Sequence, residues 1–317
     1  MGNLKFVVFN TNRTYGNMNA AKAFYPEGMS ALERNAIARA NKLKIAEEVG
    51  FDLNRLFMTL QPKGAKDRGS VYVLTPEDLA NYKDLYDYDV YADTPKVTPD
   101  TPRVAIGFNV SDAANIIAMN TKTMEATSTF CPGTHIDAKV PEGIAEVTGG
   151  NPEDIIVDVS PFAHILPLYN PNDKNWMPGY INDSKVWDGT LYRDEKTGIL
   201  YIDQLKALRK QLLASGIKEE NIIWGEDSYY TTDKNGKYIY PSSQRTRLQP
   251  DMLCNGEFIL DKETGTYAND PSQDGRFMHG VALLEETKEP YANQDIKVYS
   301  YGSARKRYIQ RGILWKH

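Results

Sequence analysis

Residues 103–131 read RVAIGFNVSDAANIIAMNTKTMEATSTFC. Three apolar runs of strand length, Arg103 to Val110, Ile116 to Asn120 and Glu125 to Phe130, alternate here with short polar segments. Apolar runs of four to eight residues bounded by turn residues are typical of strands that are buried on both faces. The stretch therefore predicts three consecutive buried strands.

Further strands and two helices are expected on either side of this stretch. The strand candidates are Lys5 to Phe9, Arg55 to Leu60, Ser70 to Leu74, Ile155 to Val159, Ile222 to Trp224, Phe258 to Leu260 and Phe277 to Leu284. Asp203 to Ser215 has leucines on one helical face and Gly216 at its end, which predicts an amphipathic helix. Strands mixed with helices indicate an α/β protein.

The other helix is predicted from Ser30 to Val49. Ser30 and Glu33 have capping-box spacing, and Gly50 ends the pattern. The apolar positions that recur at three and four residues are expected to face the core, and they are Ala36, Ile37, Ala40, Leu43, Ala46 and Val49. Residues 93–102 contain three prolines, so this segment is expected to be a connector.

Composition excludes several classes of protein. The 317 residues are 41% hydrophobic and 25% charged, as in folded globular chains. A net charge of −5 does not favour non-specific binding to nucleic acid or to anionic lipid. Two cysteines cannot build a disulfide framework, and four histidines cannot supply the sites of a multicopper oxidase. Without a signal peptide or an apolar run of 18 residues, a cytoplasmic protein with no membrane contact is expected.

Polar residues that follow the strands form the first candidate site. Ser111-Asp112-Ala113 and Cys131-Pro-Gly-Thr-His135 are expected at strand ends, where α/β proteins place their sites. Cys131 and His135 fit a thiol with its base, an incomplete zinc site, or a buried inert cysteine beside a hydrogen-bonded histidine. His164 lies in an apolar run, which is more typical of a packed histidine than of a ligand.

The order of motifs along the chain resembles the laccase-domain family, also called the YfiH-like or multicopper polyphenol oxidase family. The resemblance runs from about Phe9 to Leu284. It rests on Asn41-Lys42, Gln61-Pro62-Lys63, Ala92-Asp93, Ser111-Asp112-Ala113, Cys131-Pro132-Gly133, Asp158-Val-Ser-Pro161, Ser242-Ser-Gln-Arg245 and Gly275-Arg276-Phe277.

The resemblance implies a four-layer α/β/β/α sandwich. It predicts one domain over residues 1–287, with insertions at about 93–102, 170–198 and 261–274, and a C-terminal extension over 288–317. It also implies a metal site of His, Cys and His that acts on purine nucleosides by phosphorolysis or deamination. Here those three positions fall on Lys63, Ala113 and Cys131, so the site is expected to bind no metal and the protein to need no cofactor.

The resemblance then leaves several functions open. The first is binding of a purine nucleoside, a nucleotide or a similar small molecule without metal-dependent turnover, with Gln61, Lys63 and Arg245 as ligand-binding residues. Alternatives are a phosphorylase-like or deaminase-like enzyme, a structural or assembly subunit, and a cysteine hydrolase. If the chain is an enzyme, the predicted catalytic residues are His135, Cys131 and Asp112.

The C-terminal extension has a charge opposite to that of the remainder. Residues 288–317 carry seven Lys or Arg against Glu289 and Asp295, together with aromatic residues such as Tyr308 and Trp315. This charge predicts docking on the acidic body of the same chain or of a second copy in a homo-oligomer, rather than binding to nucleic acid.

Overall fold

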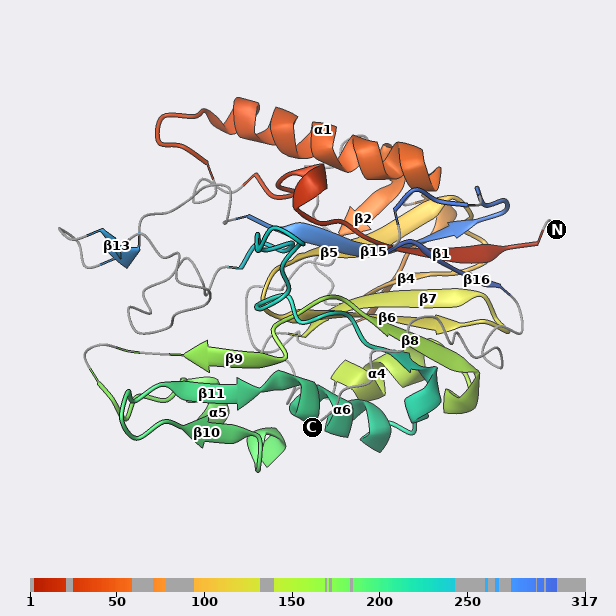
Figure 1. Ribbon diagram of the computed structural model, residues 1–317. Helices are drawn as coiled ribbons and strands as arrows, with labels where there is room; N and C mark the ends of the chain where they lie inside the picture. Colours follow the sequence, from red (N-terminus) through yellow and green to blue (C-terminus); the bar gives the residue numbers. More distant parts are fainter. Residues whose placement is uncertain are drawn as a thin grey trace.

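Two β-sheets are stacked face to face between helices in the computed structural model (Figure 1). The long helix α1 (Ala31–Val49) covers the five-stranded sheet, and α4 (Val140–Val147) and α6 (Gln204–Ala214) cover the far side of the six-stranded sheet. This confirms the predicted α/β class. The structure describes residues 3–20, 25–58, 71–77, 94–131, 140–168, 170, 173–182, 185–242, 260–261, 266–267, 275–288, 290–293 and 295–300.

The five-stranded sheet joins the two ends of the chain. Its order is β16 (Lys297–Ser300), β1 (Lys5–Asn10), β15 (Phe277–Leu284), β5 (Val104–Val110) and β2 (Leu56–Met58). Neighbours are antiparallel except for β2 and β5. Because α1 covers one face and the second sheet the other, every residue of the central strand β15 is buried.

The six-stranded sheet contains most of the stretch quoted at the outset. Its order is β12 (Ile222–Ile223), β8 (Ile155–Val159), β6 (Ala114–Asn120), β7 (Glu125–Cys131), β4 (Thr94–Val97) and β3 (Val71–Val73). The three predicted strands are confirmed as β5, β6 and β7, although β5 belongs to the other sheet.

The prediction that residues 93–102 form only a connector is wrong, because Thr94–Val97 is strand β4. Pro95 cannot donate a hydrogen bond, but a single proline removes only one donor from the ladder. Lys96 and Val97 pair with β7, and the hydroxyl oxygens of Thr94 and Thr129 lie 2.8 Å apart. Side-chain and backbone bonds therefore hold the strand in spite of the proline.

Smaller elements complete the fold. A third sheet has the order β10 (Leu191–Arg193), β11 (Leu200–Asp203) and β9 (Ile165–Leu168), and α5 (Gly179–Asn182) lies beside it. Strands β13 (Leu260–Asp261) and β14 (Thr266–Tyr267) pair with each other. The 3-10 turns are η1 (Arg13–Tyr15), η3 (Leu53–Arg55), η5 (Pro152–Asp154), η6 (Lys185–Trp187) and η7 (Glu219–Asn221). None of the helices in the described ranges is long and apolar enough to cross a membrane.

Apolar side chains fill each space between these layers. Residues such as Val7, Ile45 and Ala282 pack between α1 and the five-stranded sheet. Phe6, Ile106 and Ile117 belong to the cluster between the two sheets. Ile116, Val157 and Leu208 lie between the six-stranded sheet and its helices. Burial on both sides explains why the strands appear in the sequence as continuous apolar runs.

The ends of α1 are as predicted, but its buried face is not. Ser30 and Glu33 form the capping box, and Gly50 ends the helix with φ of 97°. Ile37 and Leu43, both expected in the core, are 39% and 43% exposed. Asn41 is buried in their place because its side-chain amide donates to the carbonyl of Asn17 at 2.9 Å. The buried face of α1 is therefore rotated from the face that the apolar pattern predicted, because Asn41 contacts the chain segment that precedes the helix.

Candidate functional site

Asp112 lies in the turn between β5 and β6 and is 6% exposed. Its carboxylate accepts hydrogen bonds from two serine hydroxyls. Ser242 donates to Oδ1, and Ser111 donates to Oδ2 at 3.4 Å. A buried carboxylate requires such partners, because burial without them is costly.

Backbone contacts fix the turn that carries Asp112. The side-chain amide of Gln204, the first residue of α6, donates to the carbonyls of Asp112 and Ala163 at 3.1 and 2.8 Å. The Ser228 hydroxyl donates to the carbonyl of Ser111 at 3.1 Å. The β5–β6 turn, the chain after β8, the start of α6 and the segment around Ser228 therefore meet at one point.

Cys131 ends β7 and lies opposite Ala114, the first residue of β6. The pairing brings Cys131 to the same end of the sheet as Asp112, as the sequence predicted. The cysteine is 1% exposed and packs in the apolar cluster beneath α4 and α6. Its thiol is 3.9 Å from the carbonyl oxygen of Thr129, to which it donates.

The other predicted site residues, Gln61, Lys63, His135 and Arg245, lie outside the described residues. In the part of the chain that the structure describes, no group of three His, Cys, Asp or Glu side chains is arranged to hold a metal ion.

His164 is a packed histidine, as its apolar surroundings predicted. Its ring is 4.8 Å from that of Phe162, and its Nε2 donates to the carbonyl of Gly225 at 2.9 Å. Burial raises the pKa of the nearby Asp227 carboxyl, and the charge of His164 opposes this rise.

A second polar cluster, which the sequence analysis missed, lies between the two sheets. Asp158 of β8 is fully buried and accepts hydrogen bonds from three side chains of the opposite sheet. The donors are His279 Nε2 at 3.3 Å, Lys297 Nζ at 3.0 Å and the Tyr299 hydroxyl at 3.0 Å. We call these four residues the inter-sheet cluster.

Hydrogen bonding and charge define the protonation states of the inter-sheet cluster. Burial acts to raise the pKa of the Asp158 carboxyl, but Lys297 and His279 outweigh it and lower this pKa. Burial lowers the pKa of His279, which favours the neutral form of its ring. Because Nε2 donates to Asp158, Nδ1 is free to accept from the Asn115 amide, which lies 3.1 Å away. The one signal in the sequence was an acidic residue within the apolar strand Ile155 to Val159.

No protein-family model and no curated protein sequence matches this chain. Solved structures do match it. The YfiH protein of Bacillus licheniformis aligns over 87% of this chain and 92% of its own, with a TM-score of 0.57 and 12% identity. YlmD of Geobacillus stearothermophilus aligns over 88% and 92%, with a TM-score of 0.56 and 15% identity. The chain has the YfiH-like fold. A DUF152 protein of Neisseria meningitidis aligns over 89% and 95%, with a TM-score of 0.51 and 12% identity. The YfiH-like fold thus accounts for nearly all of the chain.

Proposed function

We propose that the chain uses the YfiH-like fold to bind a purine nucleoside or a similar small molecule without a metal. The resemblance implies metal ligands at three positions, and the residues at two of them, Ala113 and Cys131, support this proposal. Ala113 has no donor atom, and Cys131 is buried among apolar side chains with its thiol donating to a backbone carbonyl. Zinc requires three or four donors, and a thiol must be deprotonated to serve as one.

Asp112 then supplies the polar anchor of the binding site. A nucleoside offers ribose hydroxyls and base N–H groups, which a carboxylate recognises as an acceptor. Ser242 and Ser111 hold the Asp112 carboxylate in one orientation, so little side-chain entropy is lost when a ligand binds. In this proposal the Gln61 amide also hydrogen-bonds the ligand, and Lys63 and Arg245 bind an anionic group of the ligand such as a phosphate.

Titration calorimetry with inosine, adenosine and guanosine tests the proposal, on protein treated with chelator and on protein supplied with zinc. We expect the same affinity in both preparations. Asp112→Asn is expected to weaken binding about tenfold, as for a lost hydrogen bond to a charged group. Asp188→Asn, at an exposed aspartate of the third-sheet region, is the matched control and should leave binding unchanged.

Two results would overturn the proposal. One is stoichiometric zinc or copper that is lost on Cys131→Ala. The other is release of free base when the protein is incubated with a nucleoside and phosphate, abolished by His135→Ala. The first result would establish a metal site, and the second would establish an enzyme in place of a binding protein.

A further inference from the structure

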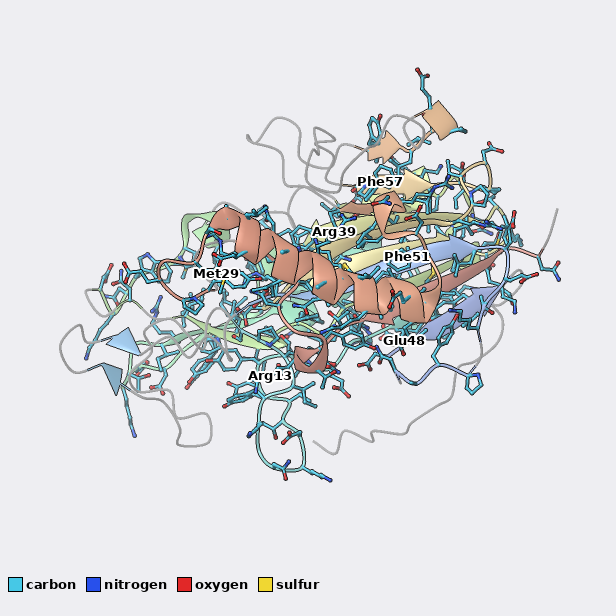
Figure 2. The ribbon with its side chains drawn as sticks, turned by 90° about the horizontal axis from the view of Figure 1, so that it is seen from above. Arg13, Met29, Arg39, Glu48, Phe51 and Phe57 are labelled. Atoms are coloured by element: carbon cyan, nitrogen blue, oxygen red, sulfur yellow. The ribbon has the colours of Figure 1, made fainter. Side chains whose placement is uncertain are left out.

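A cavity of about 530 Å³ lies at the end of α1. Its wall is formed by η1, by the last turns of α1, by the segment 226–240 and by the residues that precede β16. Figure 2 shows η1, which carries Arg13, alongside α1, which carries Glu48. Asp112 and Cys131, the two predicted site residues that the structure describes, are not among the residues that line this cavity. Its volume is in the range of small-molecule sites.

The cavity wall carries an excess of negative charge. Glu48, Glu226 and Asp295 line it, and among the lining residues that the structure describes Lys44 is the one cation. The Lys44 ammonium is exposed and donates to the Asn41 side chain at 3.1 Å. The carboxylates therefore dominate the electrostatic field inside the cavity.

Two tyrosines belong to the same wall. The Tyr15 hydroxyl donates to Glu48, and the Tyr240 hydroxyl donates to Glu226 at 3.4 Å. The backbone N–H of Asn293 donates to the second oxygen of Glu48 at 2.9 Å. The Tyr240 ring is buried against Phe277, so Tyr15 is the aromatic residue of this pair that a ligand can contact. An aromatic ring next to carboxylates attracts a flat organic cation, because the ring face and the carboxylates are both negative.

Asp295 differs from the other two acids. It is half-buried, and its carboxylate accepts no hydrogen bond from any side chain or N–H in the described ranges. The ammonium of Lys297, whose charge acts on Asp295, is 3.0 Å from Asp158 in the inter-sheet cluster. Asp295 therefore lines the cavity with an acceptor that a ligand can still satisfy.

We propose that this cavity binds a small flat organic cation, of the aryl-amidinium class, between the Tyr15 ring and the carboxylates of Glu226 and Asp295. The cationic group donates hydrogen bonds to Asp295 and Glu226, and the apolar body of the ligand contacts the Tyr15 ring. Asp112 is not a lining residue of this cavity, and the proposal does not depend on the function proposed above.

The pKa shifts of the acidic groups in the cavity wall agree with a cation-binding site. Burial, and then the charge of Glu226, raises the pKa of the Asp295 carboxyl. Burial also raises the pKa of Tyr15 and of Tyr240, and the charge of Asp295 adds to both shifts. The charged groups that act on Asp295 are Glu226, Lys297 and Asp158. A bound cation favours the ionised form of Asp295, so binding releases a proton wherever Asp295 is protonated in the free protein.

Benzamidine and benzamide are the matched probes, since they have nearly the same shape but only benzamidine is a cation. Binding is measured by titration calorimetry and by ligand-observed NMR on the full chain. We expect benzamidine to bind about tenfold more tightly than benzamide, because of its charge. Its affinity should fall as the pH is lowered and Asp295 becomes protonated.

Three variants locate the site. Asp295→Asn and Ala292→Arg should each weaken benzamidine binding about tenfold, the first by removing an anion and the second by adding a cation to an exposed position of the wall. Glu220→Gln, which removes one exposed carboxylate in η7, is the control and should have no effect. Unchanged melting temperatures would show that the variants fold.

Equal binding of the two probes, or unchanged benzamidine affinity in Asp295→Asn and Ala292→Arg, would overturn the assignment. Asp112→Asn should leave benzamidine binding intact. A failure of nucleoside binding therefore leaves this site standing, and a failure of benzamidine binding leaves the nucleoside proposal standing.

Discussion

Replacing Lys297 with methionine removes the single cation from the inter-sheet cluster. The Lys297 ammonium lies 3.0 and 3.3 Å from the two oxygens of Asp158, which has no exposed surface. After the change, Asp158 keeps only the neutral donors of His279 and Tyr299. A buried carboxylate would remain without its counter-charge, which is a strongly destabilising state.

The expected loss is smaller than for a fully buried ion pair. A hydrogen bond to a charged group contributes about 1.5–3 kcal/mol, and breaking a fully buried pair costs about 3–5 kcal/mol. The Lys297 side chain is 30% exposed, so water replaces part of its contribution. We therefore expect Lys297→Met to lower the free energy of unfolding by about 2–3 kcal/mol at pH 7.

Lys122→Met is the matched control, because Lys122 also pairs with an aspartate, Asp154, at 2.7 Å. Its side chain is 54% exposed, and exposed pairs contribute less than about 1 kcal/mol. Urea unfolding of both variants measures the difference. A double variant with Asp158→Asn should recover part of the loss from Lys297→Met, since it leaves no buried charge.

The pH dependence gives a second test. The pKa of the Asp158 carboxyl is lower in the folded chain than the unfolded value of about 3.9. Its stabilisation is therefore complete above that value and is lost as the pH falls through the folded pKa. The difference in the free energy of unfolding between wild type and Lys297→Met should shrink below about pH 4. The reasoning is refuted if Lys297→Met costs no more than Lys122→Met, or if its cost is unchanged in acid.

Three further changes test the local structure by chemical and thermal unfolding. Ser30→Ala removes the capping box of α1 and should cost about 1 kcal/mol. Ser215→Ala, at the other end of a helix, removes a half-buried hydroxyl that donates to the Gln211 carbonyl and compares the loss of an ordinary hydrogen bond. Burial lowers the pKa of Lys42 from its usual 10.5 to about 8, so holding the charged ammonium in the folded chain costs free energy. Lys42→Met should therefore stabilise the chain by about 2 kcal/mol at pH 7. This gain should vanish as the pH rises towards 10.5, where the ammonium is deprotonated in the unfolded chain as well. Gly107→Ala places a Cβ 2.7 Å from the carbonyl oxygen of His279 and should cost about 2 kcal/mol or more; a neutral effect would show that β5 and β15 can separate.

The sequence predicted the strands well, because strands buried on both faces appear as continuous apolar runs. It predicted the ends of α1 for a similar reason, since the capping box and Gly50 are local signals. The buried face of α1 and the strand β4 were missed, because both depend on contacts with distant parts of the chain. Asn41 is buried through Asn17, and β4 is held by its pairing with β7 and β3.

The candidate site was predictable only where two strands pair. Asp112 and Cys131 lie at the same end of the sheet because β6 and β7 form a hairpin, and consecutive strands commonly pair. The inter-sheet cluster was not predictable, because Lys297 lies 139 residues from Asp158 and reaches it through the pairing of β16 with β1. No spacing rule relates residues that meet across two sheets.

The same pairing changes how the C-terminal extension must be tested. Lys297 and Tyr299 lie within the extension and bind Asp158, and the Lys288 ammonium donates to the carbonyl of Glu47 at 3.1 Å. Deleting residues 288–317 would remove β16 and should destabilise the chain by more than Lys297→Met does, whatever the oligomeric state. Deleting only 301–317 keeps β16 and removes five Lys or Arg residues together with Tyr308 and Trp315. If these residues dock on a second copy, light scattering should show smaller assemblies of the 301–317 deletion, with its monomer still folded. If the assembly is unchanged but a salt-dependent affinity for RNA is lost, the docking proposal is wrong and the extension binds polyanions.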